Sequence, residues 1–466
     1  MNPLQRIARL SPRVRYALAW LVLAGGLTFG LLRSWHYFDD PKRRDGNSGH
    51  ATIDFAGQWL MGRMLLEGHA RHLYDRAAQR GVLRPVFPAA DESPTQTESD
   101  VEDLMASLMG KDDPDATRNV GGPLYPPLNA FLQAPLALLP PRVAYRTMHF
   151  VNLGLLFACG LAVVRLSRGA FWLPVATLLV ACFPGFGGCL NLGQNSALSL
   201  AILMWGWVLL DEGREGWAGV VWGLLAFKPV WAAAFFLVPL VTRRWRMAGA
   251  MLATGAALGV ATLPVVGVGA WLDWLHVGRE AAAVYEVNEN WINQSRDLLG
   301  AARRWMLDFD APDEARRASG LVPTVIGWGL LLAVLGATAA VALRRPRQAR
   351  ATRGPAAAFV LLGAWLGCYH FIYYDVLLAA LPVSLLFLER ASWRPSVPLL
   401  LTALTIVLPN VQYFVHEVFG LRIQFPWDQY LLLALWLWCG RQWLADERGN
   451  IFSHEPRTRP DGPASG

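Results

Sequence analysis

The sequence has few charged residues and few cysteines. Of its 466 residues, 17% are Asp, Glu, Lys or Arg, whereas 54% are hydrophobic. A soluble globular protein carries about 25% charged residues, and so few charges could not cover a core made from so many apolar side chains. The composition therefore excludes a soluble enzyme and a disordered chain, and it indicates a polytopic membrane protein.

The five cysteines all lie in apolar surroundings, and none lies in the long segment after the first apolar run. They are Cys159, Cys182, Cys189, Cys368 and Cys439. This placement indicates neither a disulfide framework nor a CxxC metal site, and we interpret these residues as small apolar members of a helix bundle. The first apolar run, 16–32, lacks a small-residue cleavage site after it, which is typical of a signal anchor.

The net charge of +7 comes from arginines that gather beside apolar runs, so it indicates membrane topology and no nucleic-acid partner. The clusters are Arg6/Arg9/Arg13/Arg15, Arg243/Arg244/Arg246 and Arg344/Arg345/Arg347/Arg350/Arg353. The positive-inside rule predicts that all three are cytoplasmic. Both termini are then expected inside, and the segments 33–123 and 269–322 outside.

Apolar runs of about the length that crosses a bilayer predict an all-α polytopic protein with about twelve spans. The runs are 16–32, 124–140, 147–165, 171–187, 195–211, 217–242, 246–268, 323–343, 354–372, 375–389, 395–410 and 428–446. We expect one transmembrane domain over residues 1–447, a mobile acidic insertion at 91–115 and a disordered cytoplasmic tail at 448–466.

Two features leave the order of the spans open between residues 140 and 242. Arg165 and Arg168 fall between two runs that simple counting places outside. The run 217–242 is either one long span or a hairpin of two short helices broken at Lys228–Pro229. In the first outer segment, Phe55, Trp59 and Leu66 have near-helical spacing, which predicts an interfacial helix over 54–68 that lies on the membrane surface.

Polar residues at membrane depth are costly, so those that remain are candidate site residues. Asp54 at the start of the interfacial helix is either a helix cap or a catalytic carboxylate. In NLGQNS, Gln194 and Asn195 either bind a sugar or join neighbouring helices. Lys228 either holds an anion or snorkels to the interface. Tyr125 precedes two prolines that start a helix well.

Two further stretches place polar groups on the expected outer side. The segment NWINQSR carries amide, hydroxyl and guanidinium donors that suit a phosphate or a sugar; its candidates are Asn293, Gln294, Ser295 and Arg296. The segment CYHFIYYD adds His370 and Asp375 to a group of aromatic residues of the kind common at membrane interfaces.

Several of these segments together resemble a known family. They are Asp54–Phe55 with Gly68 and Leu73–Tyr74–Asp75, Tyr125–Pro126–Pro127 with Ala134–Pro135–Leu136, Gly193–Gln194–Asn195, Lys228–Pro229, Asn293–Gln294–Ser295 and the His370 stretch leading to Asp375. In this order they resemble glycosyltransferase family 87, the polyprenol-phosphate-mannose-dependent mannosyltransferases of the GT-C fold. The resemblance covers roughly residues 10–390.

The resemblance implies a membrane enzyme that transfers a hexose, by analogy mannose, from a polyprenyl-phosphate donor to a lipid or glycan acceptor with inversion. It implies Asp54 as general base on the extracytoplasmic face of the cell membrane. The expected donor-binding residues are His370, Lys228, Arg296, Asn293, Gln294, Ser295, Gln194, Asn195 and Tyr125. No metal is required. The alternatives are a lipid or sugar transporter and a non-catalytic partner in glycan assembly.

Overall fold

The computed structural model describes residues 10–39, 54–83, 85, 124–388, 394, 396–419 and 425–451. Within this part of the chain the secondary structure is helical, and the one β pairing is an isolated antiparallel bridge between Ser295 and Ile372. The prediction of an all-α protein is confirmed. The insertion expected at 91–115 lies outside the described residues, as does the tail from residue 452 onward.

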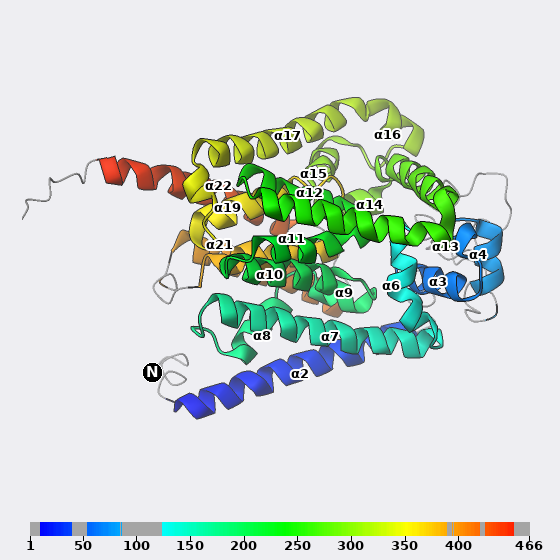
Figure 1. Ribbon diagram of the computed structural model, residues 1–466, viewed down its shortest axis with the longest axis horizontal. Helices are drawn as coiled ribbons and strands as arrows, with labels where there is room; N and C mark the ends of the chain where they lie inside the picture. Colours follow the sequence, from blue (N-terminus) through cyan, green and yellow to red (C-terminus); the bar gives the residue numbers. More distant parts are fainter. Residues whose placement is uncertain are drawn as a thin grey trace, which may run out of the picture.

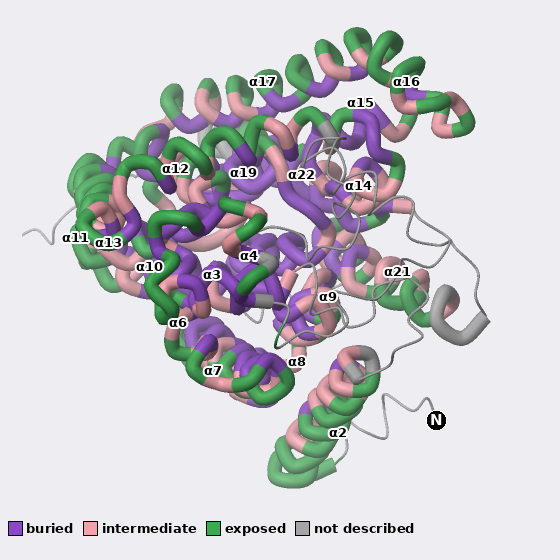
Figure 2. The backbone as a smooth tube through the Cα atoms, turned by 90° about the vertical axis from the view of Figure 1, so that its right-hand side faces the viewer, coloured by how far each residue is buried: buried purple, intermediate pink, exposed green. Residues whose placement is uncertain are grey.

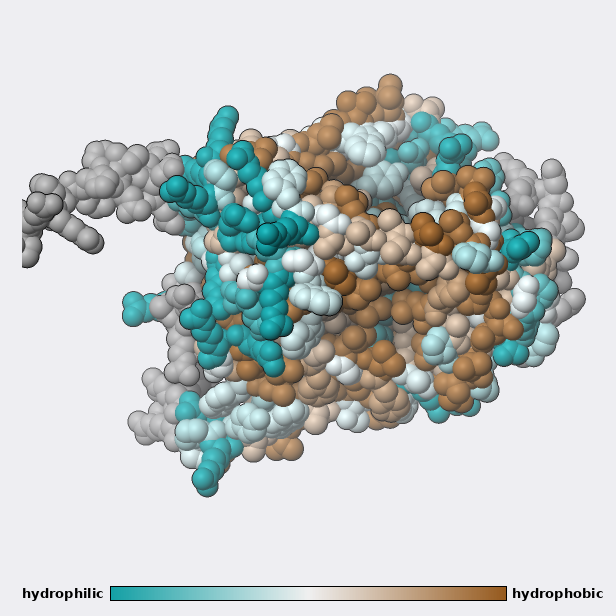
Figure 3. All heavy atoms as spheres, in the orientation of Figure 1, coloured by the Kyte–Doolittle hydropathy of each residue, from teal (hydrophilic) through white to brown (hydrophobic). Residues whose placement is uncertain are grey.

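In the part of the chain that the structure describes, five helices are long and apolar enough to cross a membrane. They are α2 (Pro12–Asp39), α7 (Pro141–Leu166), α13 (Trp245–Tyr285), α17 (Leu321–Arg344) and α21 (Val397–Phe419). Large apolar side chains such as Leu21, Phe29 and Leu332 are exposed on them, as expected for helices that face lipid. Figure 3 shows apolar surface between more hydrophilic ends. The chain is a membrane protein.

Other apolar runs form helices too short to cross a bilayer. They are α10 (Ser196–Asp211), α11 (Glu215–Gly223) with the 3₁₀ helix η5 (Leu224–Phe227), α12 (Pro229–Val241), α19 (Gly354–Leu366), and η6 (Tyr373–Ala379) with α20 (Ala380–Leu385). At 1.5 Å per residue, the 16 residues of α10 extend about 24 Å, less than the roughly 30 Å of the hydrocarbon core. The expected count of twelve spans is not confirmed.

The run 217–242 is a hairpin. Helix α11 and η5 lead into the molecule, the chain turns at Lys228, and α12 leads back. The two ends of the hairpin are adjacent, since Glu215 at the start of α11 forms an ion pair of 2.9 Å with Arg244 just after α12. Lys228 has a non-helical backbone, with φ −133° and ψ 72°. A residue before proline avoids the α region, and proline suits the first position of a helix. Of the two alternatives from the sequence, the hairpin is confirmed.

The described arginines of the three clusters meet at one end of the bundle, which we call the basic end; Arg6 and Arg9 lie outside the described residues. It comprises residues 13–15, 165–168, 211–215, 243–246 and 344–353, at the left of Figure 1. Ion pairs join its segments: Arg353 with Asp211 at 2.7 Å, Arg350 with Glu215 at 2.9 Å, and Arg165 with Glu212 at 3.8 Å. Arg15 lies over the Trp172 ring, 5.8 Å from its centroid.

Arg165 and Arg168 therefore lie at the same end as the other arginines, and the conflict in the sequence-based topology disappears. The conflict arose from the segment that forms helix α6 (Leu128–Ala137). This helix has 10 residues and extends only about 15 Å. The prediction that the run 124–140 crosses the membrane is wrong. Counting it as a span reversed the expected direction of α7.

The remaining elements complete the bundle and its opposite end. They are α3 (Phe55–Leu66), η2 (Ala70–His72), α4 (Arg76–Leu83), α8 (Leu173–Ala181), α9 (Phe186–Asn191), α14 (Glu289–Gln294), α15 (Leu298–Met306), α16 (Asp313–Ser319), α18 (Pro346–Ala349) and α22 (Trp427–Ile451). Figure 1 places α3, α4, α6 and α16 at the end away from the arginines. Helix α22 runs through Ile451, so residues 448–451 of the expected tail are helical.

The helix expected at 54–68 exists as α3, but its predicted position on the membrane surface is wrong. Nine of its twelve residues are buried. It packs closely on α6, where a Cβ on Gly62 would lie 2.7 Å from the backbone carbon of Gln133. Leu60, Met61 and Met64 add apolar faces beyond the stripe of Phe55, Trp59 and Leu66, and a helix that is apolar all round is buried.

The core has two parts. The larger apolar cluster is built from the short helices α10, α12 and α19 together with α22, and the smaller one surrounds α3 and α6. Figure 2 shows α19, α22 and α3 as mainly buried segments in the interior, whereas α2 and α17 lie at the rim with mainly exposed or intermediate residues. Helices α10 and α12 thus begin inside the protein. The polar residues at these starts, Ser196 and Lys228, need partners from the chain itself.

Candidate active site

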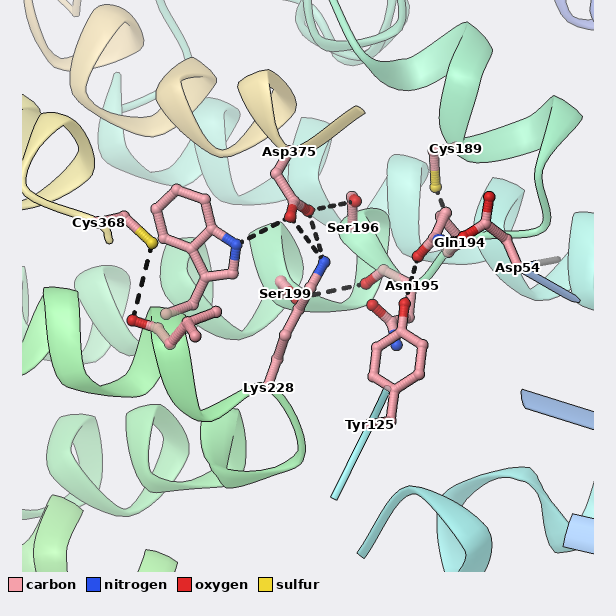
Figure 4. Close-up of polar contacts among 12 residues, drawn as sticks. Asp54, Tyr125, Cys189, Gln194, Asn195, Ser196, Ser199, Lys228, Cys368 and Asp375 are labelled. Carbon is pink, nitrogen blue, oxygen red and sulfur yellow. Dashed lines mark hydrogen bonds and ion pairs between the residues drawn. The ribbon is translucent and has the colours of Figure 1, made fainter. Parts of the chain in front are cut away.

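Three consecutive polar residues at the start of α10 each bond a different side chain, two of them in the α3 segment and one in η6. Nε2 of Gln194 donates to Oδ1 of Asp54 at 2.5 Å. Nδ2 of Asn195 donates to Oε1 of Gln58 at 3.2 Å, and the Ser196 hydroxyl donates to Oδ1 of Asp375 at 2.6 Å. Figure 4 shows the groups around Asp54 and Asp375 on either side of this turn. A polar centre therefore lies where α10 begins.

Asp54 immediately precedes α3, yet its side chain makes no capping hydrogen bond to that helix. Its Oδ1 instead accepts the bond from Gln194, which is 140 residues away in the sequence. Gln58 Nε2 fixes the backbone nearby by donating to the Asp54 carbonyl at 3.2 Å and to the Gly193 carbonyl at 3.1 Å. The capping interpretation of Asp54 is wrong, because the carboxylate belongs to the polar centre.

Tyr125 extends this network from the other side. Its hydroxyl donates to Oε1 of Gln194 at 2.5 Å, and Pro126 and Pro127 follow it at the start of α6, as expected. Burial, together with the negative charges of Asp54 and Asp375, raises the pKa of the Tyr125 hydroxyl well above its usual value. The phenol therefore keeps its proton at neutral pH and acts as the donor.

The second half of the centre is a buried ion pair. Nζ of Lys228 lies 2.7 and 2.8 Å from the two carboxylate oxygens of Asp375. The indole nitrogen of Trp231 donates to Oδ2 of Asp375 at 3.0 Å. Lys228 is 7% exposed and Asp375 3% exposed, so of the two alternatives for Lys228, the one in which it snorkels to the interface is wrong. Its ammonium is compensated by a carboxylate within the protein.

Two helix N-termini point at this pair. Helix α10 begins at Ser196, which bonds Asp375, and α12 begins directly after Lys228. The N-terminus of a helix carries a partial positive charge and unpaired N–H groups. The centre therefore combines two carboxylates, one ammonium and the positive ends of two helices.

His370 lies beside the centre. Its ring stacks on Tyr285 with centroids 4.2 Å apart, and its Nδ1 lies 3.6 Å from Oδ2 of the buried Asp297. Tyr285 packs in turn on Trp291, with ring centroids 4.7 Å apart. The imidazole thus has a carboxylate on one side and an aromatic wall on the other.

The donors of the NWINQSR segment are used to fix the protein itself. Arg296 Nε bonds Asp428 at 2.8 Å, and its Nη1 donates to the carbonyls of Asn293, Gln294 and Ser295 at 2.9–3.0 Å. The backbone nitrogen of Arg296 donates to Phe371 at 2.9 Å. This segment therefore holds the loop that carries His370.

The side chains of the same segment bond close neighbours. Gln294 donates to Oδ1 of Asn290 at 2.7 Å, Asn293 to Glu289 at 3.5 Å, and the Ser295 hydroxyl to the Ile292 carbonyl at 3.1 Å. The structure thus joins Asp54, Tyr125, Gln194 and Asn195 in one network, with Lys228 next to it and His370 alongside. The four residues Asn293–Arg296 lie behind His370.

Sequence reasoning missed several residues of the network. Gln133 Nε2 donates to Oε1 of Gln58 at 3.0 Å, and both glutamines are buried. Asn152 donates to the Gln194 carbonyl at 3.3 Å. Each is an amide inside an apolar run, which is the signal that could have identified it. Asp297 and Asp428 give no such signal, because they lie in or beside polar loops.

Among the residues that the structure describes, no group of three or more His, Cys, Asp and Glu side chains could hold a metal ion. The expectation that the reaction needs no metal stays a prediction.

The fold and the centre together define a class of protein. It is a helical membrane protein whose short helices end at a buried polar site with a carboxylate held away from its own helix. The model of glycosyltransferase family 87 matches residues 124–371, more than half of the chain, so the protein belongs to this family. Searches among curated proteins and solved structures gave no match.

The family decides between the alternatives drawn from the sequence. The protein is a membrane glycosyltransferase rather than a transporter or a non-catalytic assembly partner. The matched stretch contains Tyr125, Gln194, Lys228 and His370, whereas Asp54 precedes it. The role of Asp54 therefore rests on its position in the structure and on the resemblance.

Proposed function

We propose that the protein transfers a hexose, mannose by family resemblance, from a polyprenyl-phosphate donor to a hydroxyl of a lipid or glycan acceptor. Asp54 is the general base. The observation that carries this proposal is the bond between Asp54 and Gln194: the carboxylate that the chain could have used as a helix cap is held in a buried polar centre instead.

The reaction is a single displacement at the anomeric carbon. Asp54 takes the proton of the acceptor hydroxyl while the acceptor oxygen forms a bond to that carbon. The bond between the anomeric carbon and the phosphate oxygen breaks, and its electron pair leaves with the polyprenyl phosphate. Because attack and departure occur on opposite faces, the anomeric configuration is inverted.

The leaving phosphate gains negative charge as the bond breaks, and fixed positive groups and hydrogen-bond donors stabilise that charge. His370, held near Asp297, is the first candidate, because Lys228 is already paired with Asp375. Lys228 and the N-termini of α10 and α12 supply an oriented positive field next to it. Gln194, Asn195 and Tyr125 hold the base, and residues 293–296 hold the His370 loop. The proposal includes no metal ion.

The depth of the centre suits a lipid-linked phosphate. Helices α10 and α12, of 16 and 13 residues, run from the basic end to the centre, which places it about 20–24 Å from that end. With the basic end in the cytoplasm, the centre lies in the outer part of the roughly 30 Å hydrocarbon core. A polyprenyl phosphate in the outer leaflet reaches this level without crossing the membrane.

This orientation makes a direct prediction. Reporter fusions after Arg244 and Arg350 should report the cytoplasm, and fusions at Ala311 and Gly68 should report the extracytoplasmic side. The arginines at the basic end are the physical reason. An outside signal at Arg350 would contradict the orientation and place the centre near the cytoplasmic leaflet.

The donor class is tested with a panel of labelled donors offered to membranes that contain the protein. We expect transfer from a polyprenyl-phosphate hexose in the presence of EDTA, and none from the corresponding nucleotide sugar, because the centre lies at the depth of a lipid-linked phosphate. Membranes that carry the Asp54→Asn variant are the matched control. Transfer from the nucleotide sugar alone would overturn the proposed donor.

A further inference from the structure

A chain of three side chains, Tyr125, Gln194 and Asp54, crosses the centre. The Tyr125 hydroxyl bonds Oε1 of Gln194, and Nε2 of Gln194 bonds Oδ1 of Asp54, both at 2.5 Å. We infer that Gln194, oriented by Tyr125, is a positioning residue that orients the carboxylate with which Asp54 takes the acceptor proton and keeps that carboxylate ionised. This inference rests on the proposed function, because it assigns a support to the proposed base.

The chemistry of the three groups fixes the direction of both bonds. An ionised carboxylate only accepts hydrogen bonds, so the nitrogen end of the Gln194 amide faces Asp54. The oxygen end then faces Tyr125, whose hydroxyl has to donate. The raised pKa of Tyr125 agrees with this, since the phenol keeps its proton. The amide cannot be reversed without placing two acceptors against each other.

Further contacts hold the two loops that carry Gln194 and Asp54. The Gln194 carbonyl accepts bonds from Asn152 at 3.3 Å and from the Cys189 thiol at 3.0 Å. Gly193 has φ +60°, and a Cβ there would lie 2.8 Å from the Cβ of Phe55, the residue after Asp54. Only glycine allows this approach without strain, so the two loops are in direct contact.

Both polar ends of the Gln194 amide are used within the protein. Gln194 is 0% exposed, which favours a positioning role over direct binding of the donor sugar, the role expected from the sequence. Asp54 takes the proton of the acceptor: the acceptor O–H bond breaks, an O–H bond to the Asp54 carboxylate forms, and the acceptor oxygen keeps the electron pair for its attack.

A donor to a carboxylate stabilises the charged form, so loss of the Gln194 N–H makes Asp54 easier to protonate. The acidic limb of kcat/KM against pH then moves to higher pH. Loss of the bond also frees the carboxylate to leave its reactive position, and a displacement of about 1 Å costs roughly 10²-fold in rate. A residue that merely binds the donor would change KM instead.

The test uses the full-length protein in detergent or vesicles with polyprenyl-phosphate mannose as the probe. For Gln194→Met, which keeps the length of the side chain, we expect a kcat about 10²-fold lower, an acidic limb about one pH unit higher, and a donor KM within about threefold of wild type. For Tyr125→Phe we expect a smaller loss in the same direction.

A second substitution keeps the test valid if Gln194→Met does not fold. Gln194→Glu preserves the size and the bond from Tyr125 but replaces the donor to Asp54 by an acceptor, so the acidic limb should move up further. The matched controls are Gln348→Met, which removes an amide that bonds Trp443 at the basic end, and Tyr16→Phe on the exposed part of α2. Both controls should keep the wild-type limb.

An unchanged acidic limb in folded Gln194→Met, or a rise in donor KM at constant kcat, would overturn the inference. The Asp54→Asn variant in the same assay separates this failure from failure of the proposed function. If Asp54→Asn is inactive while Gln194→Met keeps the wild-type profile, only the positioning role is lost. If Asp54→Asn transfers normally, the base itself is misassigned.

Discussion

Asp54→Asn is expected to abolish sugar transfer while the protein still folds and inserts into the membrane. Asparagine has nearly the same shape, and its side-chain oxygen can accept the bond from Gln194 Nε2 that Asp54 accepts at 2.5 Å. The amide has no useful basicity at neutral pH, and loss of a general base costs about 10²–10⁴ in rate. The measurement is kcat with saturating donor, together with thermal unfolding of the same preparation.

The matched control is Asp75→Asn. Asp75 also precedes a helix, but its carboxylate does cap that helix, with Oδ1 accepting from the backbone nitrogens of Ala77 and Ala78 at 2.8 and 3.3 Å. Asparagine caps about as well as aspartate, so this variant should keep transfer within about twofold. Equal transfer by Asp54→Asn and Asp75→Asn would show that Asp54 has no part in the chemistry.

The second large effect concerns the stability of the Lys228–Asp375 pair. Asp375→Leu should destabilise the protein by about 3–5 kcal/mol, because it leaves the Lys228 ammonium buried without a counter-charge. The double variant Lys228→Met/Asp375→Leu should recover most of that loss, since apolar residues often replace a buried pair at little cost. Unfolding free energies of the wild type, the two single variants and the double variant measure this cycle.

The control for this cycle is the Arg63–Glu67 pair on α3, which has a bond of 2.7 Å but side chains 35% and 37% exposed. Substituting it should cost no more than about 0.5 kcal/mol. If Asp375→Leu lowered the free energy of unfolding by less than about 1 kcal/mol, this would contradict the conclusion that Lys228 and Asp375 form a buried ion pair. The folded double variant also tests whether Lys228 helps to stabilise the leaving phosphate. If it does, we expect the rate of sugar transfer by this variant to fall by about 10²–10³.

The hydropathy of the sequence, and the prolines and polar residues that interrupt its apolar runs, predicted the class of fold and several of its elements. Lys228–Pro229 made a hairpin one of two alternatives for the run 217–242, because proline restricts the residue before it. Asp54 was singled out because a carboxylate stands at the start of an apolar helix. The number of spans could not be predicted, because an apolar run indicates that a helix avoids water without distinguishing lipid from protein. Helix α19 is largely buried in the protein.

The partners of the site residues could not be predicted either. Lys228 and Asp375 are 147 residues apart, and Gln194 and Asp54 are 140 residues apart. No local pattern relates such positions, and the pairs form only when short helices from several segments end at one place. The same packing explains the error for α3: its apolar stripe predicts a face for the membrane surface, whereas nine of its twelve residues are buried among other helices, α6 among them.

Transfer by the purified protein in vesicles tests the central claim most directly. The vesicles hold wild type or Asp54→Asn, a polyprenyl-phosphate mannose labelled in the sugar, and a lipid extract as the source of acceptors. We predict that wild type moves the label to a new product with the opposite anomeric configuration, and that Asp54→Asn does not. A wild-type protein that leaves all label on the polyprenyl phosphate, or a product with retained configuration, would contradict the account.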